Sequence, residues 1–208
     1  MENKFYIAVS IIIIVFIILS IILSMNKKEI DLTKGTIDGI TYKETSEESE
    51  FIKIVANNKD VILVELDKEN APITVENFKK LVSKNYYDKT LFHRIIDGFM
   101  IQGGQGKTID NIVGEFKSNG YDNNLKHTAG VISMARAADP DSASSGFFIC
   151  VNDTGCAHLD GEYAGFGKVI AGLKTVVAIS KVQTTTGDKP VKEVEITSVT
   201  FVEVERDK

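Results

Sequence analysis

The chain has 208 residues, of which 43% are hydrophobic and 25% charged, and this composition suits one globular domain with an appendage. Its net charge of −5 and the lack of a basic run argue against a nucleic-acid partner. Two cysteines and three histidines without ligand-like spacing predict neither a disulfide framework nor a metal site. Cys150 reads as a small buried hydrophobe, with a disulfide to Cys156 as the alternative.

Residues 5–25 form the most apolar stretch of the chain, and residues 5–24 hold no charged side chain. Twenty helical residues at 1.5 Å each reach about 30 Å, the thickness of a bilayer's hydrocarbon core. We therefore predict a tail at residues 1–4 and an uncleaved single-pass membrane anchor, a transmembrane helix, at residues 5–25. A cleaved signal peptide is the alternative, although no clear small-x-small cleavage site follows the apolar run.

Lysines flank this stretch on both sides, with Lys4 before it and Lys27 and Lys28 after it, so the charges leave its orientation nearly balanced. We expect the rest of the chain on the outer face of the cell membrane, because an apolar segment at the extreme N-terminus usually serves as an export signal. Cleavage would instead give a secreted protein.

Residues 26–50 are polar and poorly periodic, and they end in Thr-Ser-Glu-Glu-Ser-Glu. Such a segment has no apolar face from which to build a core. We therefore predict a polar tether at residues 26–50 and the folded domain at residues 51–206.

Short β-rich runs dominate that domain. Residues 51–55 and 61–66 are separated by a hairpin signal, Asn-Asn-Lys-Asp, and further strands are expected at 131–135, 147–151 and 166–170. Near the C-terminus Val194 and Ile196 alternate, and Val199 and Phe201 resume one residue out of phase. This slip predicts a β-bulge.

Two helices are expected among these strands. Residues 72–85 place several apolar side chains on one helical face, and Thr74 can cap the N-terminus. A second helix is predicted near residues 171–180. Many short strands with only two helices indicate a mainly β barrel or sandwich.

Four colinear motifs stand out in this domain. They are FHRIIDGFMIQGG at residues 92–104, LKHTAGVISMAR at 125–136, SSGFFI at 144–149 and HLDGEYAGFGKV at 158–169. Together they resemble the signatures of cyclophilin-type peptidyl-prolyl cis-trans isomerases, in a bacterial-like form, over residues 51–204. The resemblance implies a closed eight-stranded antiparallel barrel capped by two α-helices.

Isomerising an X–Pro bond breaks no covalent bond, so it needs no nucleophile and no cofactor. It needs an apolar socket for the proline ring, anchors for the flanking backbone and a fixed donor that favours the twisted amide. The chain holds 21 Lys and 3 Arg, so an Arg inside the first motif suggests directed hydrogen bonding rather than a plain charge.

The resemblance assigns these roles to residues. Arg94 is implied to be the catalytic donor and Gln102 to help hold it. The implied substrate-binding residues are Phe99, Met100, Phe148 and Leu159 for the proline socket, Ala135 and Arg136 for backbone contacts, Tyr163 where many relatives carry His, and His158.

Simpler interpretations stay open for some of these residues. Arg94 could form only a surface salt bridge, and the aromatic residues could be plain core packing. Ser133 with His93 and Asp97 suggests a hydrolase triad only superficially, because no nucleophile elbow surrounds it. The Gly-Lys-Thr at residues 106–108 lacks the first glycine of a phosphate-binding loop.

Some positions depart from the family pattern. Gly146 stands where relatives usually carry a substrate-facing Gln, and the loop after Gly104 is short. Asp97 replaces a proline of the signature, and His158 replaces the Trp of cyclosporin-sensitive relatives. We expect a prolyl isomerase that acts on unfolded or newly exported proteins and binds cyclosporin with reduced affinity. The alternative is a weakened binding module or holdase chaperone on the same fold.

Overall fold

The computed structural model describes residues 31–206, and the chain from Thr33 onward forms one compact unit. Within the described residues no helix is both long enough and apolar enough to cross a membrane. The predicted tail at residues 1–4 and anchor at residues 5–25 lie outside the described part of the chain. They stay predictions.

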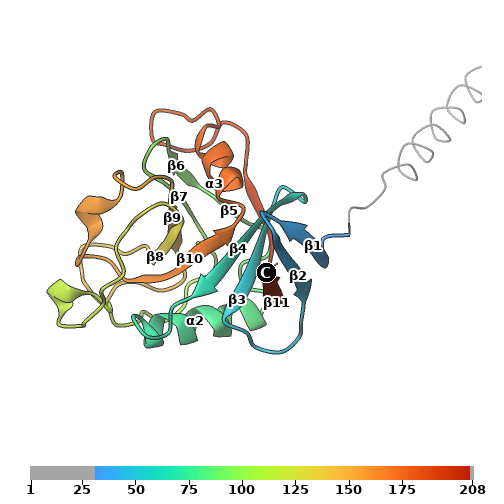
Figure 1. Ribbon diagram of the computed structural model, residues 1–208. Coiled ribbons are helices and arrows are strands. Elements are labelled where there is room, and N and C mark those ends of the chain that lie inside the picture. The colour runs from blue at the N-terminus through green and yellow to red at the C-terminus, as the bar shows by residue number, and fades with distance from the viewer. Residues whose placement is uncertain (1–30, 207–208) are drawn as a thin grey trace, which may run out of the picture. The chain divides into compact units, whose positions relative to one another are not determined.

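Within residues 31–206, eleven strands form one sheet in which every paired neighbour runs antiparallel (Figure 1). Strand β5 (Thr90–Leu91) pairs with the first residues of β11, on the side of β11 opposite β3. The order of the others along the sheet is β1 (Lys34–Ile37), β2 (Ile40–Glu44), β11 (Glu195–Arg206), β3 (Phe51–Ala56), β4 (Asp60–Leu66), β10 (Gly165–Ala171), β8 (Val131–Met134), β9 (Phe147–Cys150), β7 (Met100–Gly103) and β6 (Arg94–Ile96).

The sheet is not the closed eight-stranded barrel that we predicted. Its pairing path runs open from β1 to β6, and in the described part of the chain β6 does not pair with β11. Strand β6 has only three residues, and the loop before β11 lies beside it. Single backbone hydrogen bonds bridge the gap, from Phe92 N to Val194 O at 2.9 Å and from Ile95 N to Asp188 O at 2.8 Å.

Residues 34–44 correct the prediction of a tether over residues 26–50. They form the β1–β2 hairpin, and β2 pairs with the C-terminal end of β11, where Val202 lies opposite Glu44. Tyr42 is buried in this joint, and Glu44 forms an ion pair with the buried Lys53 on β3. The run Ile40-Thr-Tyr42 alternates over too few residues to stand out in a polar segment, and it becomes a strand because β11 is long enough to pair with it.

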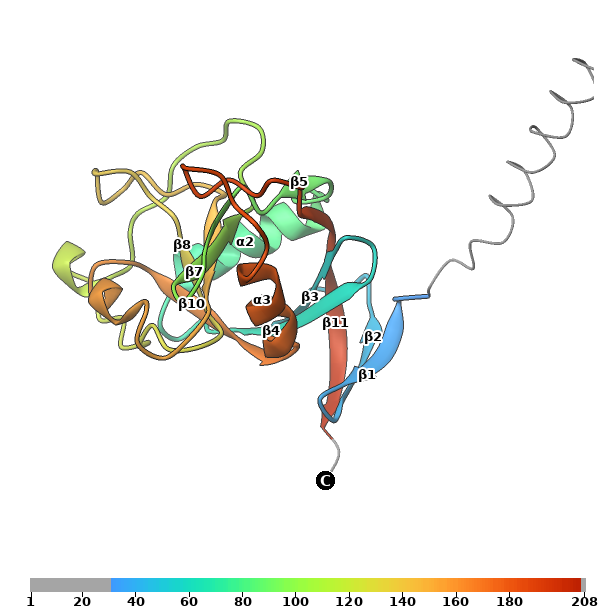
Figure 2. The same cartoon turned by 90° about the horizontal axis from the view of Figure 1, so that it is seen from above.

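Both predicted helices are confirmed as α2 (Pro72–Ser83) and α3 (Leu173–Ser180). Figure 1 shows α2 below the sheet and α3 above it, and Figure 2 shows α3 in front of α2 when viewed from above. The buried face of α2 is the predicted one, with Phe78 stacked on Tyr87 at 4.9 Å between ring centroids.

The predicted N-cap at Thr74 is wrong. Ala71 occupies the cap and Pro72 the first helical turn, where a missing N–H costs nothing. The free N–H groups of Ile73 and Thr74 donate instead to the buried carboxylate of Glu115, at 3.0 and 2.7 Å. The carboxylate of Glu115, which is distant in sequence, therefore caps the N-terminus of α2 in place of a neighbouring residue.

The remaining strand predictions agree with the structure to within about a residue at each end. The predicted bulge is confirmed, because the register of β11 against β3 shifts between Ile196 and Ser198. Cys150 and Cys156 are both buried and free, so the alternative disulfide is not formed.

Candidate active site

The site begins with the hairpin of β6 and β7. Arg94 and Gln102 lie directly opposite each other in this antiparallel pair, so their side chains share one face. The tight turn between the strands uses Gly98 at a φ of 71°, a conformation that favours glycine. On its other side β7 pairs with β9, where Gln102 lies opposite Phe148.

An apolar cluster separate from the main core lies beside Gln102. Met100, Phe148 and Leu159 are buried in it, and Phe99 and Tyr163 pack against them. Three distant segments of the chain thus meet in one socket.

A cavity of about 120 Å³ lies at this meeting point. It is lined by nine of the ten predicted site residues and by no others: Arg94, Phe99, Met100, Gln102, Ala135, Arg136, Phe148, Leu159 and Tyr163. The cavity therefore has an apolar side, a guanidinium and an amide, as the socket-and-donor chemistry requires.

His158 is the tenth predicted residue, and it does not line this cavity. It is exposed on the short helix η2 (Ala157–Leu159), with its ring 5.3 Å from that of Phe99. It borders the socket from outside.

Arg136 is held in place at the rim of the cavity. Its guanidinium carbon lies 4.5 Å from the centre of the Tyr163 ring and 5.0 Å from that of Phe116. Its Nη2 and Nε donate to the carbonyl of Glu162 at 2.9 and 3.2 Å. The resemblance assigned only backbone to Arg136, and the structure adds a side chain that fixes this rim to the loop before Tyr163.

A second cavity of about 290 Å³ adjoins the first and shares Gln102, Ala135 and Arg136 with it. Its other lining residues are small or polar, and they include Gln105 from the short loop and Gly146. The apolar socket thus opens onto a polar chamber, in which Gly146 contributes no side chain.

The surface salt bridge that the sequence left open for Arg94 is present, with a partner that the sequence did not indicate. Arg94 Nε lies 3.3 Å from Oδ2 of Asp188, and the two side chains are 43% and 41% exposed. The guanidinium of Arg94 thus donates to Asp188, and no side-chain hydrogen bond between Arg94 and Gln102 is found in the described part of the chain. Asp188 stands in a Thr-Gly-Asp-Lys loop that no motif marked, and 94 residues separate it from Arg94.

A buried Ser-His-Asp chain lies behind the socket, with partners other than those weighed from the sequence. His127 Nε2 is 3.0 Å from Ser133 Oγ, and His127 Nδ1 is 3.1 Å from Asp160 Oδ1. The ring of His127 stacks on Phe148 with centroids 6.1 Å apart. Ser133 is fully buried, so its hydroxyl is not accessible to solvent as a nucleophile. The three hydrogen-bonded side chains instead support the wall of the socket.

Burial and hydrogen bonding also shift the pKa values of His127 and Asp160. It lowers the pKa of His127, although hydrogen bonding and the charge of Asp160 oppose the shift. Partial burial alone would raise the pKa of Asp160, but hydrogen bonds from His127 and Lys126 outweigh it and lower that pKa. The favoured state is a neutral imidazole beside a carboxylate.

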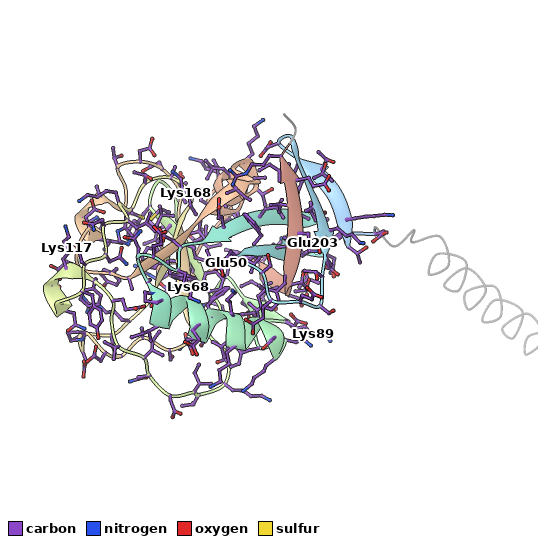
Figure 3. The ribbon with its side chains drawn as sticks, turned by 60° about the horizontal axis from the view of Figure 1, so that its bottom comes forward. Glu50, Lys68, Lys89, Lys117, Lys168 and Glu203 are labelled. Atoms are coloured by element: carbon purple, nitrogen blue, oxygen red, sulfur yellow. The ribbon has the colours of Figure 1, made fainter. Side chains whose placement is uncertain are left out.

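A larger cavity, about 510 Å³, lies elsewhere. Glu50, Lys68 and Lys168 line it, and Figure 3 shows them in the region between α2 and β10. Positively and negatively charged side chains line this cavity. None of the predicted site residues lines it. The smaller cavity around Arg94 is the one with an apolar socket.

Comparisons with known proteins identify the family of this chain. The family model described as cyclophilin type peptidyl-prolyl cis-trans isomerase/CLD matches residues 51–201. The peptidyl-prolyl cis-trans isomerase-like 1 of Gibberella zeae is 42% identical over 149 residues, covering 69% of this chain and 90% of that protein. A peptidyl-prolyl cis-trans isomerase of Acinetobacter baylyi is 42% identical over 130 residues, covering 60% of this chain and 69% of that protein.

A solved structure shares the fold. It is a cyclophilin-type peptidyl-prolyl cis-trans isomerase of Cryptosporidium parvum, crystallised in the presence of the dipeptide Ala-Pro. Its TM-score is 0.62 and its identity 30%, over 72% of this chain and 97% of that one. The chain therefore belongs to the cyclophilin family of peptidyl-prolyl cis-trans isomerases and is an enzyme of that class.

Proposed function

We propose that this isomerase turns over X–Pro bonds in the cavity around Arg94, with Arg94 as the catalytic donor and Gln102 beside it. The observation that carries the proposal is the single cavity in which both face four apolar side chains. Those side chains, Phe99, Met100, Phe148 and Leu159, receive the proline ring. The backbone of Ala135 and Arg136 and the ring of Tyr163 border the residues that precede it.

The chemistry follows from amide resonance. Rotation about an X–Pro bond crosses a barrier of about 18–20 kcal/mol because twisting removes the partial double bond. The nitrogen then becomes pyramidal and can accept a hydrogen bond that it cannot accept when planar. An Arg94 N–H aimed at this nitrogen stabilises the twisted state more than either planar isomer, and so lowers the barrier.

Activity on an Ala-Pro peptide tests the role of Arg94. Loss of one preorganised donor typically lowers the rate by about 10²–10³, so Arg94→Ala is expected to reduce kcat/KM by that factor with the fold intact. Arg94→Lys should restore little, because a flexible ammonium does not reproduce the planar fork. Exchange NMR measures the rates and circular dichroism checks the fold. A Lys variant that keeps most of the activity would show that the assignment is wrong.

The substrates and location are also part of the proposal. We place the enzyme at the outer face of the cell membrane, tethered through residues 5–25, where exported proteins with exposed X–Pro bonds emerge unfolded. The alternative is release after signal cleavage. Alkaline phosphatase fused to the C-terminus, which works only outside the cytoplasm, should be active, and an abundant but inactive fusion would contradict this orientation. We keep the bacterial-like assignment as a proposal, since relatives of 42% identity come from both a fungus and a bacterium.

Cyclosporin binding is expected to be weak because of His158. An indole in this place beside Phe99 would cover more apolar surface than an imidazole does. At about 25 cal/mol per Å², a deficit of some tens of Å² weakens binding by about 1–2 kcal/mol, near tenfold or more. His158→Trp should therefore sharpen inhibition about tenfold while turnover changes little. Titrating cyclosporin against both proteins measures this, and equal inhibition would place His158 outside the drug site.

A holdase or binding module is the second candidate, and Gly146 is the feature that favours it. Without a side chain there, the polar chamber lacks one amide that could anchor a peptide backbone. Such a protein would bind X–Pro segments and release them slowly, with little effect on isomerisation rate.

A further inference from the structure

The segment 181–194 joins helix α3 to strand β11 and lies along the outer edge of β6, where the sheet is open. It contacts the β6–β7 hairpin at separate points. Ile95 N donates to Asp188 O at 2.8 Å, and Lys181 Nζ lies 2.7 Å from Asp97 Oδ1. The open edge next to Arg94 is thus covered by one continuous segment.

This segment has a defined local fold at its tip. Thr184 and Pro190 form an isolated β-bridge, and Thr185 N donates to Lys189 O at 2.8 Å. Asp188 N donates back to Thr185 O at 3.1 Å, and Pro190 is buried. Asp188 itself has a φ of 62°, so the turn directs its backbone carbonyl to Ile95 while its side chain reaches Arg94.

The contact on Arg94 is made at one particular atom. Asp188 Oδ2 accepts from Nε, the inner nitrogen of the guanidinium. Because the guanidinium is planar and conjugated, a partner on Nε sets the plane of the group and leaves both terminal nitrogens to donate elsewhere. Arg94 lines the cavity, whereas Asp188 does not line it and contacts Arg94 from segment 181–194.

We propose that Asp188 is a positioning residue of the isomerase: it orients the Arg94 guanidinium so that its terminal N–H groups face the prolyl amide. This inference rests on the proposed role of Arg94. Both side chains are about two-fifths exposed, so solvent screening makes the pair weak in energy. Its effect is therefore on geometry, and a moderate loss of rate is expected.

Two substitutions separate orientation from folding. Asp188→Gly removes the acceptor at a φ that glycine adopts without strain, and Asp188→Asn keeps an acceptor oxygen on a residue that also tolerates this φ. One hydrogen bond corresponds to a factor of about 2–10, so Asp188→Gly should lower kcat by that factor with KM nearly unchanged. Asp188→Asn should keep most of the wild-type kcat.

Lys181→Ala is the matched control. It removes another exposed ion pair between the same segment and the same hairpin, but Lys181 lines neither cavity of the site. Its kcat and KM should equal those of the wild type. A loss as large as that of Asp188→Gly would show that the segment matters only as a structural clamp, and would overturn the proposal.

The deciding experiment places Asp188→Gly in the wild-type and Arg94→Lys backgrounds and measures kcat and KM by exchange NMR on an Ala-Pro peptide. If Asp188 acts through the guanidinium, the substitution should lower kcat only when Arg94 is present. An unchanged kcat in the wild-type background, an equal loss in both backgrounds, or an Asp188→Asn protein as slow as Asp188→Gly would each overturn the proposal. Full activity of Arg94→Lys alone would instead overturn the role of Arg94 on which it rests.

Discussion

Gly146 lines the polar chamber beside Ala135, which lines both cavities. A Cβ added there would lie 3.5 Å from the Cβ of Ala135, an ordinary contact, and the backbone of Gly146 is not left-handed. The chamber of about 290 Å³ has space beside it. A larger side chain should therefore fit without moving the backbone.

Gly146→Gln is expected to raise kcat/KM on short peptides. The added amide can make one hydrogen bond to the peptide backbone, worth about 0.5–1.5 kcal/mol net, or roughly a factor of 2–10. Gly146→Ala supplies the Cβ without the amide and should leave kcat/KM unchanged. If the Gln variant is no faster, or slower, the chamber has been rebuilt around the glycine.

His127 makes stability depend on pH. Burial lowers its pKa in the folded protein, so the unfolded chain binds more protons as the pH falls below the ordinary value of about 6.5. The folded state should therefore lose stability from about pH 7 downward. Burial lowers the pKa of His93 as well and acts in the same direction. The lowered pKa of Asp160 acts in a more acidic window, where its stabilisation is lost as the carboxylate is protonated.

Denaturant unfolding between pH 7.5 and 5 measures this slope. His93→Gln should remove only part of it, and His127→Gln should flatten it further while lowering stability at pH 7.5, because Ser133 and Asp160 lose a buried partner. A free energy of unfolding that does not change over this range would contradict the buried neutral imidazole.

At the scale of elements, the β1–β2 hairpin and the end of β11 lie beyond the family match, which spans residues 51–201. Tyr42, Glu44 and Lys53 join the hairpin to the part of the sheet within the family match. Lys53 is 1% exposed and its ammonium pairs with Glu44, which also accepts from Thr200 Oγ1 at 3.1 Å. The hairpin is thus fastened to β3 by a charge that has little access to water.

Glu44→Gln is expected to destabilise the protein by about 1–3 kcal/mol, since it removes the anionic partner of a buried ammonium. Part of the cost is relieved because Glu44 is 30% exposed and water can approach. Glu203→Gln, an exposed change on β11 that Figure 3 shows, should stay within about 0.5 kcal/mol. Denaturant unfolding compares the two, and equal stabilities would mean that the pair contributes nothing.

The sequence predicted the elements whose signals are local. The β-rich runs of β3 and β4 with the hairpin signal between them, the apolar face of α2 and the phase slip in β11 are each patterns within short stretches of sequence. The hairpin at residues 34–44 was missed because its pairing partner lies some 160 residues away on β11. The cap on α2 was missed for the same reason, since Glu115 reaches it from 41 residues along the chain.

The candidate site divides in the same way. Its residues from Arg94 to Tyr163 came from motifs, and the structure brings nine of the ten predicted side chains around one cavity. Asp188 could not be predicted, because only the folded course of segment 181–194 carries it to Arg94. Nor could the partners of His127, since Ser133 and Asp160 meet it only after β8 and η2 have packed together.

At the scale of the whole molecule, the sheet is open at β6, so the cavity around Arg94 lies next to the irregular segment 181–194. Strands β7, β8 and β9 pair continuously and hold the socket, whereas β6 ends the pairing path and depends on segment 181–194 for its outer contacts. The socket thus lies on paired strands, and Arg94, the proposed catalytic donor, lies on a three-residue strand at the end of the pairing path.

The central claim is that this chain catalyses isomerisation and does not merely bind proline segments. Refolding of a protein whose slow phase is limited by an X–Pro bond tests it directly, with the isomerase added far below the refolding protein in amount. We predict that the slow phase accelerates in proportion to the added enzyme, and that Arg94→Ala abolishes the acceleration. Suppressed aggregation without any change in the slow phase would contradict the account and favour the holdase.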